Sequence, residues 1–339
     1  MIEQIVPRAG TPILIVGVGS IGQRHLRNLK SLGYTNLAAT DTNPDRIASV
    51  SEHLGITTFT DLETAVDQFQ PQMVLVCTPP ALHVEQACIA LEANAHIFIE
   101  KPLSHTLEDV DKLAALAEER QRVIQVGYNL RHHPVFQRVK TVLDAHEIGQ
   151  IQWARLEIGQ YLPDWRPQID YRQNYTARRE LGGGILLDAS HEIDLALWFL
   201  GQPTVLCCMA GNLSALEVNV EDSASILARF ESGAQADIHL DFIQRGYHRN
   251  GKITGSAGWV SWDFPMGMVS LYRGDAKTTE VLQFPPDMNT MYIQELQVFL
   301  ETSFRNQFSL DSLTQAVQIL RFVRLARQSS EERKWLDFA

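Results

Sequence analysis

The sequence predicts an α/β protein of two domains, and two patterns of apolar residues carry this prediction. Over roughly the first 125 residues, short apolar runs alternate with longer segments of helical spacing. Beyond about residue 130, several segments alternate apolar and polar residues with a period of two. We therefore expect a first domain over residues 1–128 with a parallel sheet and a second over residues 129–339 with a largely antiparallel sheet.

The apolar runs of the first domain contain few polar residues, as expected of strands that helices cover on both faces of a sheet. A segment with helical spacing, His25–Leu32, follows the first run. Strands that alternate with helices build a parallel, doubly wound sheet. The expected strands are Ile13–Val16, Asn36–Thr40, Met73–Cys77, Ala95–Ile99 and Arg122–Val126.

The second domain combines helices with strands that bury one face. Val135–Leu143 and Ile193–Leu200 have helical spacing, and so has the end of the chain, Met291–Ser330. Alternation with a period of two places every second side chain on the same face of a strand. The segments that show it are Gln152–Gln160, Ser223–Phe230, Ala234–Phe242 and Gly258–Phe264.

Composition and charge exclude several classes of partner. Of 339 residues, 45% are apolar and 20% are charged, which is ordinary for a globular protein. The 29 lysines and arginines against 40 aspartates and glutamates give a net charge of −11, which argues against nucleic acid and anionic membranes as partners. No apolar run is long enough to span a bilayer and no signal-peptide pattern opens the chain, so we expect a cytoplasmic protein.

A glycine motif follows the first expected strand and opens the helix behind it, with residues 17–22 reading Gly-Val-Gly-Ser-Ile-Gly. Gly17 permits a sharp turn, Gly19 lets backbone amides approach a pyrophosphate, and Gly22 lets helix and strand pack closely. Ser20 and Ile21 stand at the helix N-terminus, whose partial positive charge favours phosphate. Such glycines also mark turns that bind nothing, but the surrounding strand, turn and helix predict a Rossmann domain that binds a dinucleotide.

An aspartate follows the second expected strand, nineteen residues after Gly22. The Asp41 carboxylate can accept hydrogen bonds from the ribose hydroxyls of NAD, whereas the 2′-phosphate of NADP would meet repulsion of up to about 4 kcal/mol. We therefore expect NAD to be preferred over NADP. Alternatively, Asp41 only caps an Asp-Thr-Asn-Pro turn, and the nearby Arg46 reduces the selectivity for NAD.

Two further segments follow strand ends, where the ligands of doubly wound sheets bind. Thr78 and Pro79, directly after the third expected strand, are expected to border the cofactor. His83 is either a further cofactor contact or a surface residue at a helix start. After the fourth strand, Glu100 and Lys101 enter the crevice where nicotinamide would lie, a position that distinguishes this lysine from an ordinary surface lysine.

The segment from Gly182 to Asp194 holds a second catalytic candidate. If a helix starts near Asp188, then Asp188, His191 and Asp194 recur every three residues on adjacent parts of one face. Histidine can take a proton from an alcohol near neutral pH, and a carboxylate can orient it. The alternative is a partly buried histidine held by a capping aspartate. We expect no metal site, because neither a cysteine nor a second histidine accompanies Asp188, His191 and Glu192.

Aromatic and basic residues of the second domain are candidates for substrate binding. Asn129 and Arg131 follow the domain boundary, and Trp165, Arg166 and Tyr171 cluster further on. Tryptophan and tyrosine can stack on sugar faces, and arginine binds carboxylates or phosphates through two parallel hydrogen bonds. The later cluster is equally compatible with a surface loop that packs at a subunit contact.

The chain resembles the Gfo/Idh/MocA oxidoreductases, which include glucose-fructose oxidoreductase and inositol dehydrogenase. The resemblance covers nearly the whole chain and implies a Rossmann domain followed by an α/β domain. The open, mainly antiparallel sheet of that second domain is implied to form the contact of a homodimer or homotetramer. The motifs that carry the resemblance are Gly17–Gly22, Thr78-Pro79, Glu100-Lys101-Pro102, Gly127-Tyr128-Asn129 with Arg131, His132 and Pro134, and Gly182–Asp194.

The resemblance also implies the chemistry. Lys101 matches the family's catalytic lysine and His191 its general acid/base, whereas Asp188 stands three residues before the histidine instead of the four found in many members. The implied enzyme transfers a hydride between nicotinamide and a secondary hydroxyl carbon of a sugar, sugar acid, nucleotide-sugar or cyclitol, with Lys101 and His191 meeting at one nicotinamide ring. An NAD-dependent glycoside hydrolase and a non-catalytic NAD-binding regulator are the alternatives, and the presence of both residues argues against the regulator.

Overall fold

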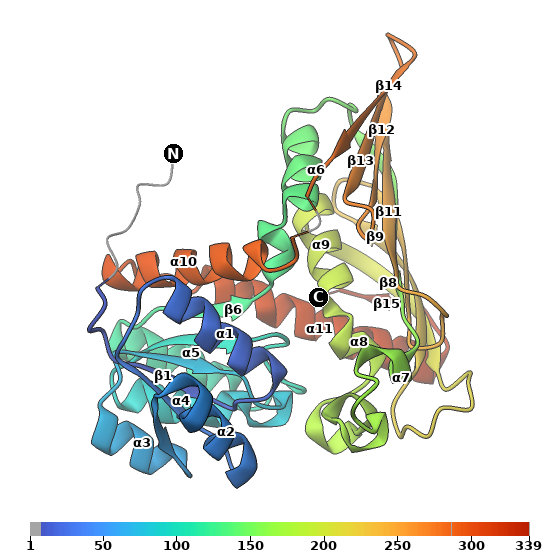
Figure 1. Cartoon of the computed structure of the whole chain (residues 1–339). Helices are drawn as coiled ribbons and strands as arrows, with labels where there is room; N and C mark the ends of the chain where they lie inside the picture. Colours follow the sequence, from blue (N-terminus) through green and yellow to red (C-terminus); the bar gives the residue numbers. More distant parts are fainter. Residues whose placement is uncertain (1–7, 286, 339) are drawn as a thin grey trace. The chain divides into compact units, whose positions relative to one another are not determined.

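The computed structural model describes residues 8–285 and 287–338, which fold as two compact units (Figure 1). One unit runs to Gly127 and includes Tyr292–Val317, and the other comprises Tyr128–Met291 and the residues from Gln318 onward. The first boundary therefore lies within one residue of the expected division at 128. The expectation that all of residues 129–339 form the second domain is wrong, because Tyr292–Val317 packs with the first unit.

A parallel sheet forms the centre of the first unit, as predicted, with the doubly wound order β3-β2-β1-β4-β5-β6. Its strands are β1 (Ile13–Val16), β2 (Leu37–Thr40), β3 (Thr57–Phe59), β4 (Met73–Val76), β5 (His96–Glu100) and β6 (Ile124–Gly127). The apolar pattern did not predict the edge strand β3, because this strand is short and partly exposed. The other strands lie within two residues of the expected runs.

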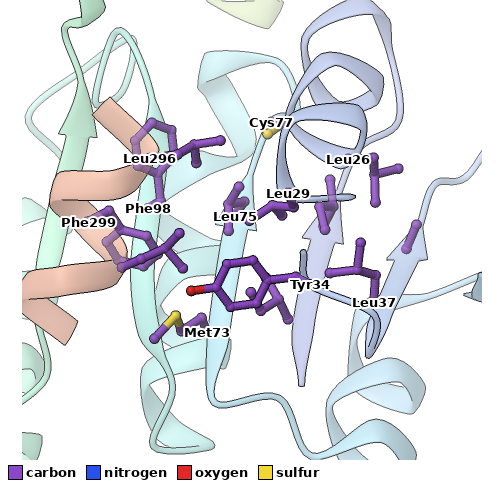
Figure 2. Close-up of a cluster of buried hydrophobic side chains, with 14 of the residues drawn as sticks. Leu26, Leu29, Tyr34, Leu37, Met73, Leu75, Cys77, Phe98, Leu296 and Phe299 are labelled. Atoms are coloured by element: carbon purple, nitrogen blue, oxygen red, sulfur yellow. The ribbon is translucent and has the colours of Figure 1, made fainter. Parts of the chain in front are cut away.

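Helices cover both faces of this sheet. Helix α4 packs against α3 and α5, whereas α1 shares a core layer with α10 (Thr290–Phe304). Figure 2 shows that layer, in which Leu296 and Phe299 of α10 meet Leu29, Leu75 and Phe98. Burial of this apolar face explains why the C-terminal segment returns to the first unit. The remaining helices here are α1 (Ser20–Ser31), α2 (Pro44–Leu54), α3 (Leu62–Phe69), α4 (His83–Glu92) and α5 (Val110–Arg120).

A mixed, mainly antiparallel sheet forms the second unit, with the order β14-β13-β12-β11-β7-β10-β9-β8-β15. Strands β7 and β10 run parallel, and the other neighbours pair antiparallel. The strands are β7 (Ile151–Gly159), β8 (Pro203–Gly211), β9 (Ser223–Phe230), β10 (Gln235–Asp241), β11 (His248–Gly255), β12 (Gly258–Asp263), β13 (Met268–Arg273), β14 (Thr278–Gln283) and β15 (Leu336–Asp337). Polar residues and glycines interrupt the alternation of β11 and β14, which the period-two pattern therefore missed.

Helices lie on one face of the second sheet. Helix α6 (Pro134–Asp144) packs on β12 and β13, and α9 (Ser190–Leu200) packs on β7 and β10 (Figure 1). The far end of α11 (Asp311–Glu332) reaches this unit, where Ser329 accepts a hydrogen bond from the Cys208 amide. Within residues 8–285 and 287–338, no helix combines the length and hydropathy needed to cross a bilayer.

Candidate active site

The glycine turn between β1 and α1 has the predicted geometry. Gly17 adopts φ +87°, and a Cβ there would stand 2.8 Å from the Thr78 methyl group. A Cβ on Gly22 would clash with the Gly17 carbonyl oxygen, so this glycine lets α1 pack onto the turn. A Cβ on Gly19, by contrast, would have no other atom of the described chain within 4 Å. The N-terminus of α1, which begins at Ser20 without a side-chain cap, is therefore open to a phosphate.

Asp41 lies beside this glycine turn. Its Oδ2 accepts a hydrogen bond from the Val18 amide at 2.9 Å, and its Oδ1 accepts one from the Asn43 amide at 2.9 Å. The capping role is thus present together with the position next to the glycine turn. The exposed guanidinium of Arg46 lies 3.6 Å from Oδ2. Because each carboxylate oxygen has a second lone pair, Asp41 retains the capacity to bind a ribose hydroxyl.

His83 connects the loops that follow β4 and β5. Its Nε2 lies 2.7 Å from the Thr78 carbonyl oxygen and its Nδ1 lies 2.9 Å from that of Pro102. The residue is 1% exposed, and burial lowers the pKa of its imidazole. The alternative of a surface residue is therefore wrong. Because both ring nitrogens face backbone carbonyl oxygens, His83 holds the loops around Thr78 and Lys101 together. Thr78 and Pro79 are partly exposed.

The candidate lysine follows the last residue of β5, Glu100. The Glu100 carboxylate is turned inward, with Oε1 2.7 Å from His25 Nε2 and Oε2 accepting the Lys101 amide at 3.2 Å. Lys101 itself is partly exposed, and its peptide bond to Pro102 is cis. Glu100 therefore supports the lysine turn from inside the unit.

Asp188 and His191 lie in two helices rather than one. Helix α8 (Ile185–Asp188) ends at Asp188, Ala189 has φ −94° and ψ 22°, and α9 begins at Ser190. The expectation of a single helix starting near Asp188 is therefore wrong. The break lies at Ala189, whose ψ departs from helical geometry, while at the other end of α8 the Ile185 amide donates to the Glu221 carbonyl oxygen at 3.0 Å.

The surroundings of Asp188 and His191 are largely apolar and aromatic. His191 is 9% exposed and stands edge-on to Tyr128, with ring centroids 5.7 Å apart. Asp188 is 6% exposed, and its Oδ1 accepts a hydrogen bond from the Tyr175 hydroxyl at 2.8 Å. Burial, reinforced by the Asp188 charge, raises the pKa of Tyr175 well above its usual value, so the phenol remains a donor. Nothing in the local sequence distinguishes Tyr175 from Tyr171, so the role of Tyr175 could not be predicted from the sequence.

Arg131 forms a two-pronged ion pair with Asp194 of α9. Its Nε lies 3.0 Å from both carboxylate oxygens and its Nη2 lies 2.6 Å from Oδ1. Asp194 is fully buried, and burial raises its pKa while the Arg131 charge opposes this rise. The pair fixes the orientation of the Arg131 guanidinium and of α9, and the Arg131 side chain remains 21% exposed. Asn129, close by in the chain, is buried, and its Oδ1 has no hydrogen-bond partner among the described residues.

The predicted aromatic and basic cluster is divided in the structure. The Trp165 indole donates to the Gln160 carbonyl oxygen at 3.0 Å and is thereby held in place, and the Tyr171 hydroxyl accepts the Glu217 amide at 3.2 Å. Arg166 is exposed, and its charge opposes the burial that raises the pKa of Tyr175. Arg166 is thus the member of this cluster that acts electrostatically on the pair of Tyr175 and Asp188.

Two family models match the chain. One is described as the oxidoreductase family with an NAD-binding Rossmann fold and matches residues 12–128, and the other is the GFO/IDH/MocA C-terminal domain and matches residues 136–261. The chain belongs to the Gfo/Idh/MocA oxidoreductase family. The family membership predicted from the motifs is therefore confirmed, together with an NAD-binding first domain.

Relatives of this family resemble the chain along most of its length. The myo-inositol 2-dehydrogenase of Thermotoga maritima is 27% identical over 85% of this chain and 86% of its own length. YrbE of Bacillus subtilis, an uncharacterized oxidoreductase, is 28% identical over 93% of each protein. A solved levoglucosan dehydrogenase in complex with NADH has a TM-score of 0.87 at 19% identity, covering 97% of this chain and 99% of that one. The latter likeness shows a common fold.

The geometry of the first unit fits the cofactor of this family. The space beside Gly19 and the uncapped start of α1 suit a pyrophosphate, and Asp41 borders the same turn. Thr78 lies against Gly17 from the next strand of the sheet. These residues are the ones that would hold NAD.

Proposed function

We propose that the protein is an NAD-dependent dehydrogenase or reductase acting on a secondary hydroxyl of a sugar, sugar acid, nucleotide-sugar or cyclitol. One observation carries the proposal: a member of an oxidoreductase family has an amine, Lys101, directly after β5 and an imidazole, His191, in the first turn of α9. Relatives named myo-inositol 2-dehydrogenase and levoglucosan dehydrogenase support this class of substrate.

In the proposed reaction, NAD supplies the acceptor of the hydride when it is bound. His191 takes the proton of the substrate hydroxyl on its imidazole while the carbinol C–H bond breaks and a C=O bond forms. The Lys101 ammonium stabilises the negative charge that develops on the oxygen. The Asp188 carboxylate, oriented by Tyr175, favours the protonated form of the imidazole electrostatically.

The proposed cofactor preference is NAD over NADP. The Asp41 carboxylate accepts a hydrogen bond from the ribose of NAD and repels an additional phosphate, and Arg46 offsets part of this repulsion. Asp41→Ala is expected to weaken NAD binding about tenfold, the loss of about 1.4 kcal/mol expected for a hydrogen bond to a charged group. Titration of protein fluorescence with NADH and NADPH tests the preference. Equal affinities in the unmodified protein contradict it.

We propose that Asn129, Trp165, Arg166 and Tyr171 line the substrate. Arg166 is exposed and suits a carboxylate or phosphate, whereas Trp165 is held by Gln160 and offers a ring of fixed orientation. Arg166→Ala is therefore expected to raise KM for acidic substrates about tenfold and to leave KM for neutral ones unchanged. A uniform rise of KM for both classes contradicts this assignment.

The experiment that tests the function follows NADH absorbance while the protein is incubated with NAD and a panel of sugars, sugar acids, nucleotide-sugars and inositols. We expect net NADH with at least one of them. His191→Ala and Lys101→Ala are each expected to lower kcat by about 10²- to 10⁴-fold with little change in the Kd of NAD. Wild-type turnover in either variant removes that residue from the mechanism.

The same assay separates the alternatives. Release of an aglycone from glycosides without net NADH favours an NAD-dependent glycoside hydrolase. NAD binding with no turnover of any alcohol or glycoside favours a regulator.

We also propose that the uncovered face of the second sheet joins subunits in a homodimer or homotetramer. Adjacent strands place Cys207, Leu227, Asp237 and Arg155 in one register row, and Leu227 is 49% exposed. Leu227→Glu is expected to shift the molar mass in light scattering to that of a monomer, with Ala115→Glu on the exposed side of α5 as control. An unchanged mass in Leu227→Glu contradicts the proposed interface.

A further inference from the structure

We infer that His25 is a positioning residue of the proposed reaction, which couples helix α1 to the turn of Glu100 and Lys101. The inference rests on the proposed function, because it takes Lys101 as the group that stabilises the reacting oxygen. His25 lies on α1, six residues after Gly19 of the dinucleotide turn. The same helix therefore carries the phosphate-binding end and the contact to the lysine turn.

The contact between His25 and Glu100 is short and enclosed. His25 is fully buried, Glu100 is 8% exposed, and His25 Nε2 lies 2.7 Å from Glu100 Oε1. An ionised carboxylate offers only acceptors, so Nε2 carries the proton in this bond. Nδ1 of His25 has no hydrogen-bond partner among the described residues, so the imidazole makes its hydrogen bond to Glu100 through Nε2.

Aromatic packing fixes the orientation of the imidazole. The rings of Phe98 and Tyr292 stand edge-on to it, with centroids 5.3 and 6.2 Å away. From the other side, a Cβ on Gly127 would lie 3.0 Å from the Phe98 ring and 3.4 Å from Glu100 Oε2. The absence of a side chain at Gly127 leaves the carboxylate room to face His25, and the packed rings leave the imidazole no alternative partner.

The second oxygen of Glu100 carries the coupling to Lys101. Oε2 accepts the Lys101 amide at 3.2 Å, while Oε1 is held by His25. A buried carboxylate that loses one of its donors must find another partner or take up a proton, and either change weakens its hydrogen bond to the Lys101 amide. Because rates fall steeply when a catalytic group is misplaced by a fraction of an ångström, the loss of His25 is expected to affect turnover more than NAD affinity.

Two substitutions at His25 test this role. His25→Leu removes the donor, whereas His25→Gln retains an N–H group near the position of Nε2. We expect His25→Leu to lower kcat about 10- to 100-fold, His25→Gln to recover most of this loss, and the Kd of NAD to change less than about threefold in both.

The matched control is His96→Leu, which removes another buried histidine at the opposite end of β5. His96 accepts the Val123 amide at 3.1 Å, so this variant loses stability but retains its turnover per folded molecule. Thermal melts of all variants provide the folded fraction. Equal losses of kcat in His25→Leu and His96→Leu contradict a positioning role.

Hydrogen exchange of the Lys101 amide is a second readout that does not depend on the reaction. Mass spectrometry of the protein without added cofactor is expected to show about tenfold faster exchange at this amide in His25→Leu but not in His96→Leu. Unchanged exchange together with wild-type kcat in His25→Leu overturns the inference. A wild-type protein that turns over no alcohol contradicts the proposed function instead, and the exchange experiment still decides whether His25 holds the lysine turn.

Discussion

Two glycine turns of the molecule, at Gly17–Gly22 and at Gly182–Gly184, differ in which atoms occupy the space beside them. A Cβ on Gly19 of the first unit would have no described atom within 4 Å apart from those of its chain neighbours. In the second unit, a Cβ on Gly183 would overlap the Tyr175 carbonyl oxygen, and one on Gly184 would stand 2.5 Å from the Glu221 carboxylate. At Gly183 and Gly184 the group that approaches the glycine is thus the protein itself, whereas the space beside Gly19 is left open.

Contacts from Arg327 and Glu221 hold the second turn and the start of α8 in place. Arg327 Nη2 lies 2.8 Å from Glu221 Oε1 and 3.4 Å from the Gly183 carbonyl oxygen, and the Glu221 backbone accepts the Ile185 amide. These contacts orient the short helix that ends at Asp188.

The largest effect is expected from Gly184→Ala, which tests the close packing between the second turn and Glu221. Gly184 has φ +113°, and the added methyl group meets the Glu221 carboxylate, so the variant is expected to lose about 2–4 kcal/mol of unfolding free energy. Urea denaturation measures this loss. The control is Gly201→Ala, which has φ +87° but open space around its Cβ and is expected to lose about 1 kcal/mol. Equal losses of unfolding free energy in the two variants would mean that the contact with Glu221 does not constrain Gly184.

Gly19→Val tests whether the first turn leaves space for a ligand beside Gly19. Because the space at Gly19 is open, the variant is expected to fold with wild-type stability. The valine would occupy the position of a pyrophosphate, and the Kd of NAD is expected to rise about 100-fold, or about 2.7 kcal/mol. Fluorescence titration with NADH measures the affinity. An unchanged Kd would place the pyrophosphate elsewhere and remove the contrast between the turns.

Tyr175→Phe asks whether the second turn positions Asp188 for catalysis. The variant loses the hydroxyl that donates to Asp188 Oδ1, and kcat is expected to fall about tenfold, which corresponds to about 1.4 kcal/mol. The Kd of NAD should not change. Tyr34→Phe, at another buried tyrosine, serves as control and should retain wild-type kcat. A Tyr175→Phe enzyme with full kcat would mean that its bond to Asp188 is only structural.

The smallest effect concerns His96, at the end of β5 remote from the lysine turn. Burial lowers the pKa of His96 to about 4, whereas an unfolded histidine titrates near 6.5. The unfolded chain therefore binds the extra proton in this window, and stability falls as the pH decreases from about 6.5 to about 4. His96→Asn retains an acceptor for the Val123 amide but does not titrate. It should remove about 1 kcal/mol of the loss between pH 6.5 and 5.5, as measured by urea denaturation at both pH values. An identical pH dependence would exclude His96 as its source.

Local patterns were sufficient for most of the first sheet and for the glycine turn. Fully buried strands such as β1 and β4 are apolar throughout, and Gly22 meets the carbonyl oxygen of Gly17, five residues earlier in the same motif. The break between α8 and α9 at Ala189 leaves no mark in the helical spacing of the sequence, and it was not predicted. The sequence also placed most of α10 and the start of α11 in the wrong unit, since helical spacing does not specify which core a helix covers.

The sequence by itself determined the family, the order of strands and helices, and the candidates Lys101 and His191, because these depend on short-range periodicity and on motifs of fixed spacing. Only the tertiary structure assigned partners to Glu100 and Asp188, which His25 and Tyr175 hold. Hydrogen bonds between residues far apart in the chain leave no periodic trace in the sequence. A buried carboxylate takes its donor from whichever element the fold brings beside it.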